Sequence, residues 1–141
     1  MTTTINADNV QGGAVVTGDA SGQLELQAAG TALLSLAGDA VTFQKSVVET
    51  VYTLTGTALD PANGTIQTKT LSAPVTLTDS LSSGESLVLM LNGGATHSVN
   101  FPPITWVTGS GNAAPTLTAN DTIVFWKIST TLYGAYVGSY T

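Results

Sequence analysis

The sequence offers very few side chains that could carry out catalysis or bind a metal ion. His97 is the only histidine, and the chain has no cysteine. An imidazole can transfer protons or bind a metal, but a serine hydrolase also needs an orienting acid, and no Gly-x-Ser-x-Gly motif frames any serine. Strand alternation would place His97 on one face with Val99 and Phe101. We therefore interpret His97 as a structural residue, and the sequence predicts no catalytic residue.

The nine acidic residues are spread along the chain and single out no reactive pair. Two carboxylates across one groove can hydrolyse a glycosidic bond, so a small glycan-cleaving enzyme is a third hypothesis, without assigned residues. Asp19, Asp39 and Asp60 lie in turn-forming segments, where their side chains would bond the local backbone. The segment from Asp60 to Gly64 lacks the further spaced oxygens and the terminal glutamate of a calcium loop. The sequence therefore predicts no metal and no cofactor.

The charge balance argues against two kinds of partner. The 141 residues include nine acidic residues, three lysines and no arginine, and the net charge is −6. Binding of nucleic acid requires cations that neutralise phosphates, and a helix on a membrane surface requires a basic face. The longest apolar run, Leu87 to Leu91, is far shorter than a bilayer span, and the N-terminal residues show no secretory signal. We expect neither nucleic acid nor a membrane as a partner.

Exposed aromatic rings could still bind a carbohydrate by stacking against it. Trp126 alternates with Val124 and Ile128, which favours a place in the core. Trp106 follows a proline-rich segment and precedes a glycine-rich loop, and Tyr140 lies close to the last residue. Trp106 and Tyr140 are therefore the rings that we expect to be exposed, and they are the candidates for glycan stacking.

Residues 1–46 contain apolar residues in short alternating triplets between turn-forming segments. Such triplets predict very short strands. Strands this short bury too little surface to offset backbone ordering, which costs about 1–2 kcal/mol per residue. We therefore predict an intertwined stem in which identical copies share one core, as three copies around a threefold axis would. The predicted trimer-interface residues are Leu24, Leu26, Leu34, Leu36, Val41 and Phe43.

Residues 47–141 contain longer apolar segments and all of the tryptophans and tyrosines. The expected strands, separated by turn-forming segments, are residues 47–54, 65–71, 75–79, 86–91, 95–101, 121–128 and 130–137. Asn92-Gly93 between two of these strands predicts a tight hairpin. The predicted fold class is therefore all-β: a short-stranded N-terminal intertwined stem, residues 1–46, is followed by a compact antiparallel β-sandwich head, residues 47–141.

Two groups of segments resemble the virion structural proteins of tailed bacteriophages. Met1 to Asn9, Thr17 to Gln27 and Ala29 to Leu33 are similar to the N-terminal segment of proteins known as tail fibres or virion structural proteins. A second group is similar to the small β-domain that closes such proteins, and it comprises residues 65–77, 84–87, 104–106, 114–117 and 126–136. The likeness covers nearly the whole chain.

This resemblance implies a trimeric, β-rich, non-enzymatic component of the virion surface, without a cofactor. It also favours a trimer over a dimer. The expected partners are further copies of the chain and other virion proteins, such as the major capsid protein or a tail component. The chain lacks the long repetitive shaft of a tail fibre, which favours a short head fibre or a capsid decoration protein. The alternative is a tail-fibre or receptor-binding tip protein that recognises host surface glycans through Trp106 and Tyr140.

Overall fold

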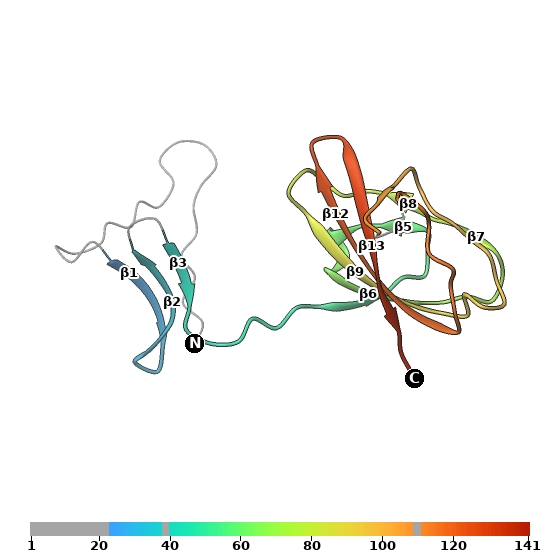
Figure 1. Cartoon of the computed structure of the whole chain (residues 1–141). Coiled ribbons are helices and arrows are strands. Elements are labelled where there is room, and N and C mark those ends of the chain that lie inside the picture. Colours follow the sequence, from blue (N-terminus) through green and yellow to red (C-terminus); the bar gives the residue numbers. More distant parts are fainter. Residues whose placement is uncertain (1–22, 38–39, 109–110) are drawn as a thin grey trace, which may run out of the picture. The chain divides into compact units, whose positions relative to one another are not determined.

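The computed structural model describes residues 23–37, 40–108 and 111–141 of the chain. The chain divides into two compact units, Met1–Val48 and Glu49–Thr141, which we call the N-terminal unit and the head unit (Figure 1). The division predicted from the sequence lay between residues 46 and 47. The described residues form β-strands and one 3₁₀ helix, with no α-helix among them. The all-β fold class is therefore confirmed.

The N-terminal unit contains one antiparallel sheet of three strands in the order β1-β2-β3. The strands are β1 (Gln23–Ala28), β2 (Thr31–Ala37) and β3 (Ala40–Phe43). Ala29 and Gly30 join β1 to β2 with φ values of +51° and +74°. Positive φ at both central residues is the backbone of a tight type I′ hairpin. Local turn conformation therefore determines the pairing of β1 with β2.

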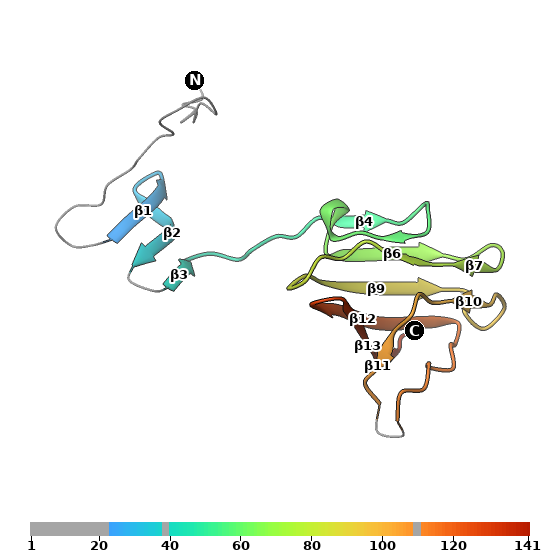
Figure 2. The ribbon, with the colours of Figure 1, turned by 90° about the horizontal axis from the view of Figure 1, so that it is seen from above.

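The head unit is built on a six-stranded sheet in the order β11-β13-β12-β9-β6-β4, which Figure 2 shows strand by strand. The strands are β4 (Val51–Thr53), β6 (Ile66–Thr70), β9 (Ser86–Asn92), β11 (Thr105–Trp106), β12 (Asn120–Ile128) and β13 (Thr131–Ser139). β12 is antiparallel to β9 and β13, whereas β4 with β6, β6 with β9 and β11 with β13 are parallel. The sheet is mixed, so the prediction of a purely antiparallel head is wrong. Parallel neighbours need long crossing connections, and residues 54–65 and 71–85 supply two of them.

Two pairs of short parallel strands complete the head unit. β5 (Ala58–Leu59) pairs with β8 (Thr78–Asp79), and β7 (Val75–Thr76) pairs with β10 (Val99–Asn100). The 3₁₀ helix Pro61–Asn63 follows Asp60, whose Oδ1 accepts a hydrogen bond from the Ala62 N–H at 3.0 Å. Asp60 is therefore a turn residue, as predicted from the sequence.

The segment after β9 does not form the predicted hairpin. β9 pairs along its length with β12, and of residues 95–101 only Val99–Asn100 is a strand, paired with β7. Gly93 instead allows the chain to pass close to Leu71, because a Cβ at Gly93 would lie 3.1 Å from the Leu71 carbonyl oxygen. Pairing with the nine-residue β12 satisfies more backbone N–H and C=O groups than a short local neighbour could. The long-range partner therefore prevails over the local turn signal.

The core of the head unit lies on one face of the six-stranded sheet, which we call the inner face. Alternate residues of the two central strands point into this core, as period-two alternation requires: Leu87, Leu89 and Leu91 from β9, and Ile123 and Phe125 from β12. Leu59 of β5 and Leu77, which lies between β7 and β8, are buried against them. The segments that carry the short strand pairs therefore cover the inner face.

The structure places the two tryptophans differently from the sequence prediction. Trp106 is 7% exposed and packs edge-to-face on Phe101, with ring centroids 5.1 Å apart. It lies over Gly134 of β13, where a Cβ would come within 3.0 Å of the indole. Trp126 faces away from the core, is half-buried, and stacks on Tyr133. The predictions that Trp106 is exposed and that Trp126 lies in the core are both wrong, because the pairing of β11 with β13 places Trp106 beside a residue without a side chain.

Candidate functional site

The six predicted trimer-interface residues lie together on one face of the N-terminal sheet. Residues directly opposite each other on neighbouring strands point to the same side of a sheet. The register forms two such rows: Leu24, Leu36 and Val41 in one, and Leu26, Leu34 and Phe43 in the other. We call these six residues the stem face.

The stem face is largely uncovered among the described residues of the chain. Leu26, Val41 and Phe43 are 52%, 59% and 61% exposed, and the other three members are half-buried. An apolar side chain stabilises a fold in proportion to the surface that it removes from water. Against the described residues these side chains contribute little of that free energy, and an exposed apolar face of this kind is typical of an interaction surface.

In the described part of the head unit, the face of the six-stranded sheet opposite the core is also uncovered. The register of β4, β6, β9, β12 and β13 aligns its outward side chains in three rows. The central row is Val51, Ile66, Val88, Val124 and Ala135; one flanking row is Thr53, Thr68, Met90 and Thr122, and the other is Ser86, Trp126 and Tyr133. We call these residues the outer face. None of them carries a formal charge near neutral pH.

The composition of the outer face is typical of a protein interface. Trp126 and Tyr133 stack with ring centroids 5.8 Å apart and ring planes 10° apart. Val51 at the edge of the face is exposed, and Val88 and Val124 at its centre are half-buried between their neighbours in the sheet. Aromatic residues and methionine are enriched at the centres of interfaces and charged residues are depleted. The outer face follows both tendencies.

The structure does not bring Trp106 and Tyr140 together as two exposed rings. Trp106 lies in the core, and Tyr140 is half-buried with its backbone N–H donating to the Asn120 carbonyl at 3.1 Å. Stacking on a sugar requires an open ring face. Of the two residues predicted for glycan stacking, only Tyr140 is partly exposed.

His97 lies in the turn that follows β9 rather than in a strand. Its backbone N–H donates to the Gly93 carbonyl at 3.0 Å, and its side chain is half-buried. The predicted alternation of His97 with Val99 and Phe101 therefore does not apply. Within the described ranges, no group of three or more histidine or acidic side chains could hold a metal ion.

Asp121 is the centre of a buried polar network that the sequence did not reveal. Its carboxylate accepts hydrogen bonds from the Thr118 N–H at 2.8 Å, the Thr118 hydroxyl at 2.7 Å and the Tyr136 hydroxyl at 2.9 Å. The hydrogen bond to Asp121, with burial as a second cause, raises the pKa of Tyr136 above its usual value of 10.0. Three donors to one fully buried carboxylate indicate a structural role for Asp121.

Lys69 differs from the other two lysines of the chain. Lys127 forms an ion pair with Asp79 at 2.6 Å, and Lys45 is exposed. Lys69 points from β6 to the inner face, is 9% exposed, and forms no ion pair with any carboxylate of the described residues. Its Nζ donates instead to the backbone carbonyl oxygens of Leu54 at 3.2 Å and Gly56 at 2.7 Å.

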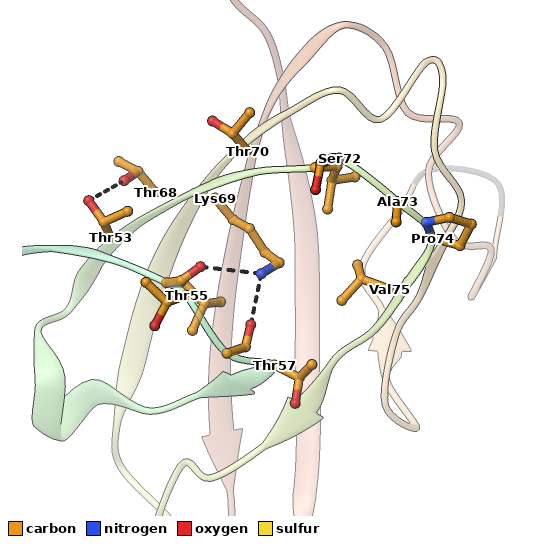
Figure 3. Close-up of a pocket in the computed structure, with 13 residues that line it drawn as sticks. Thr53, Thr55, Thr57, Thr68, Lys69, Thr70, Ser72, Ala73, Pro74 and Val75 are labelled. Atoms are coloured by element: carbon orange, nitrogen blue, oxygen red, sulfur yellow. Dashed lines mark hydrogen bonds between the residues drawn. The ribbon is translucent and has the colours of Figure 1, made fainter.

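Lys69 lines a pocket of about 510 Å³ beside the end of β4 (Figure 3). The Leu54 N–H still donates to the Thr68 carbonyl at 2.8 Å, after which the chain leaves the edge of β6. The residues that line the pocket include Thr55, Thr57 and Ser72, which carry hydroxyl groups, and the apolar residues Ala73, Pro74 and Val75. No acidic residue lines it. We call it the Lys69 pocket.

One pattern in the sequence could have pointed to Lys69. Gln67, Lys69 and Leu71 alternate along one strand, and Leu71 marks their shared side as the buried one. A lysine at such a position is unusual, because charged side chains are almost never fully buried unless they are paired. The alternation therefore marks Lys69 as a candidate, although it says nothing of the pocket around it.

Comparison with known proteins identifies no relative of this chain: no protein-family model, no curated protein and no solved structure matches it. No helix within the described part of the chain is long and apolar enough to cross a membrane. The stem face, the outer face and the Lys69 pocket are therefore the features from which a function can be inferred.

Proposed function

We propose that this chain is a non-enzymatic structural protein of a bacteriophage particle, a homotrimeric head fibre or capsid decoration protein on the particle surface. In this proposal three N-terminal units intertwine into a stem, and each head unit forms a β-sandwich. Another virion protein, such as the major capsid protein or a tail component, holds the trimer on the particle. The assignment to a virion depends on the resemblance of the segments described above.

The observation that carries the assembly proposal is the stem face. It aligns six apolar side chains in two cross-strand rows, and three of them are more than half exposed. Full burial of one such side chain stabilises by about 1.5–3 kcal/mol, so covering the stem face would contribute roughly 5–10 kcal/mol per copy before ordering costs. Identical copies would supply a matching apolar surface to one another.

The outer face supports the same proposal from the head unit. Strands lie about 4.8 Å apart and alternate residues about 6.7 Å apart along a strand, so the outermost positions of the five strands and three rows lie roughly 19 Å and 13 Å apart. Contiguous exposed patches that carry apolar and aromatic side chains indicate an interaction site when they reach a few hundred Å². A second copy of the chain presents a surface of the same kind.

Sedimentation equilibrium of the purified full chain tests the assembly. We expect a single species with three times the chain mass of 14.3 kDa, and a species of one chain mass across the whole concentration range would refute the homotrimer. Immunogold labelling of phage particles from the host that encodes the chain tests the virion role. Gold is expected at regular positions on the particle surface, and particles that remain unlabelled although the host produces the chain would refute that role.

The alternative function is that of a tail-fibre or receptor-binding tip protein that recognises host surface glycans. The observation that favours it is the Lys69 pocket, since the burial of Trp106 removes one of the two rings first considered for stacking. A glycan array probed with the labelled full chain separates the two functions. A purely structural protein should bind no glycan on the array.

A further inference from the structure

Lys69 is a buried cation without a counter-charge in the part of the chain that the structure describes. Its Nζ has two acceptors, the backbone carbonyl oxygens of Leu54 and Gly56. An ammonium group has three N–H donors, so one donor has no acceptor among the described residues. Removing a cation from water without an anion carries a large desolvation penalty, and two carbonyl dipoles offset only part of it. The surroundings of Nζ therefore favour an anion.

The Lys69 pocket has room for a small ligand beside this cation. Its volume of about 510 Å³ lies within the range of about 300–1,000 Å³ that is usual for small-molecule sites. In the view of Figure 3, Nζ lies between Thr55 on one side and Val75 on the other. No carboxylate of the pocket competes for the ammonium. The net charge of −6 opposes an anion only weakly, because salt screens charges beyond about 10 Å.

The remaining groups of the pocket indicate what the anion is attached to. Threonine and serine hydroxyls both donate and accept hydrogen bonds, which matches the hydroxyl groups of a sugar. Ala73, Pro74 and Val75 form an apolar wall that suits the carbon-bound hydrogens of a sugar ring. We infer that the Lys69 pocket binds a sugar unit that carries a carboxylate, with the carboxylate on Lys69 and the sugar hydroxyls on Thr55, Thr57 and Ser72.

This site lies within one head unit, deepens the alternative function of glycan recognition, and does not depend on the homotrimer. Its test is a titration of the full chain with sodium glucuronate, glucose or sodium acetate at constant ionic strength, followed by the backbone amide signals of Thr55, Gly56 and Ser72 in ¹H–¹⁵N NMR spectra. Glucuronate is expected to shift these signals saturably. Glucose lacks the carboxylate and should bind at least about tenfold more weakly, since a charge-assisted hydrogen bond contributes about one to two orders of magnitude in affinity. Acetate keeps the carboxylate but lacks the sugar hydroxyls, so it should also bind more weakly, because it forms fewer hydrogen bonds in the pocket.

Two lysine variants separate the cation in the pocket from charge in general. Lys69→Met keeps the buried stem and removes the ammonium, and it should weaken glucuronate binding by about tenfold or more. Lys45→Met removes an exposed lysine with the same change in net charge, and it should bind glucuronate like the unaltered chain. Circular dichroism checks that both variants fold. The comparison of the three ligands uses the unaltered chain, so it remains decisive even if Lys69→Met does not fold.

Four results would overturn the inference. They are the absence of saturable shifts with glucuronate, binding of glucose as tight as that of glucuronate, binding of acetate as tight as that of glucuronate, and undiminished binding by folded Lys69→Met. A lower melting temperature of Lys69→Met together with unaltered glucuronate affinity would show that Lys69 has a structural role only, in which its hydrogen bonds hold residues 54–56 against β6. A trimeric mass without glucuronate binding would refute this site and leave the proposed function intact.

Discussion

The hydroxyl of Tyr136 on β13 donates a hydrogen bond of 2.9 Å to Oδ1 of Asp121 on the neighbouring strand β12. Asp121 is fully buried, and its second oxygen, Oδ2, accepts from the Thr118 N–H. The loop that follows β9 passes close to this network at Gly94, where a Cβ would lie 3.1 Å from Oδ2 of Asp121. The Asp121 network thus joins β12, β13 and two loops at one end of the sheet.

The Tyr136 hydrogen bond predicts a loss of stability at alkaline pH. The folded-state pKa of Tyr136 is raised above 10.0, chiefly by the hydrogen bond to Asp121, so the fold favours the protonated phenol. This contribution is fully present below the unfolded pKa of about 10 and is lost as the pH rises through the higher folded value. Urea unfolding from neutral pH to about pH 11 should show a smaller alkaline loss for Tyr136→Phe than for the unaltered chain.

Tyr133→Phe is the matched control for that comparison. The Tyr133 ring lies on the outer face, and its hydroxyl makes no hydrogen bond within the described residues. Its alkaline loss of stability should equal that of the unaltered chain. An equal alkaline loss in Tyr136→Phe and the unaltered chain would show that the Asp121 network does not control the titration of Tyr136.

The contact between Trp106 and Gly134 predicts a large effect of a single added methyl group. Gly134→Ala would place a Cβ 3.0 Å from both the indole of Trp106 and Cγ2 of Ile104. Overpacking of a close-packed core costs about 1–3 kcal/mol, so the urea midpoint should fall and the tryptophan fluorescence should change. Gly56→Ala is the control, because the space around Gly56 is open. Equal midpoints for the two variants would contradict the tight packing of β11 on β13.

The stem face predicts that assembly depends on one side of the N-terminal sheet. Leu34→Asp combined with Leu36→Asp introduces two charges into the stem face, and the species should fall to the 14.3 kDa of one chain, because burying unpaired charges in an apolar interface is unfavourable. Ser35→Asp combined with Thr42→Asp adds the same charge to the opposite face, where these two residues pair in register. The control should keep the assembled mass in sedimentation equilibrium. An assembled mass for both double variants would count against the stem.

The outer face predicts a second contribution to assembly from the head unit. Val124→Lys places an ammonium at the centre of the middle row, so the assembly should dissociate at a protein concentration about tenfold higher or more, since an unpaired charge in an interface is costly. Val107→Lys adds the same charge at an exposed position beyond β11, off the outer face, and is the control. Mass photometry over a dilution series compares the two. Identical dissociation curves for both variants would exclude the outer face from the interface.

Local patterns in the sequence predicted the N-terminal sheet more closely than the head. The triplets around Leu24, Leu34 and Val41 are strands, because alternation along a strand depends only on neighbouring residues. The pairing of β9 depends instead on β12, which lies far along the chain, so the turn signal at Asn92-Gly93 was misleading. A turn signal describes local backbone conformation, whereas the partner of a strand follows from the contacts of the whole domain.

By itself the sequence determined that the described chain is all-β, that Asp60 is a turn residue, and that the leucines of each triplet share one side of a strand. These properties follow from backbone conformation and side-chain alternation over a few residues. Only the tertiary structure decided that Trp106 is buried on Gly134, that Trp126 lies on the outer face, and that Lys69 lines a pocket. Each of these depends on which distant strand or loop lies opposite the residue, and short-range patterns do not contain that information.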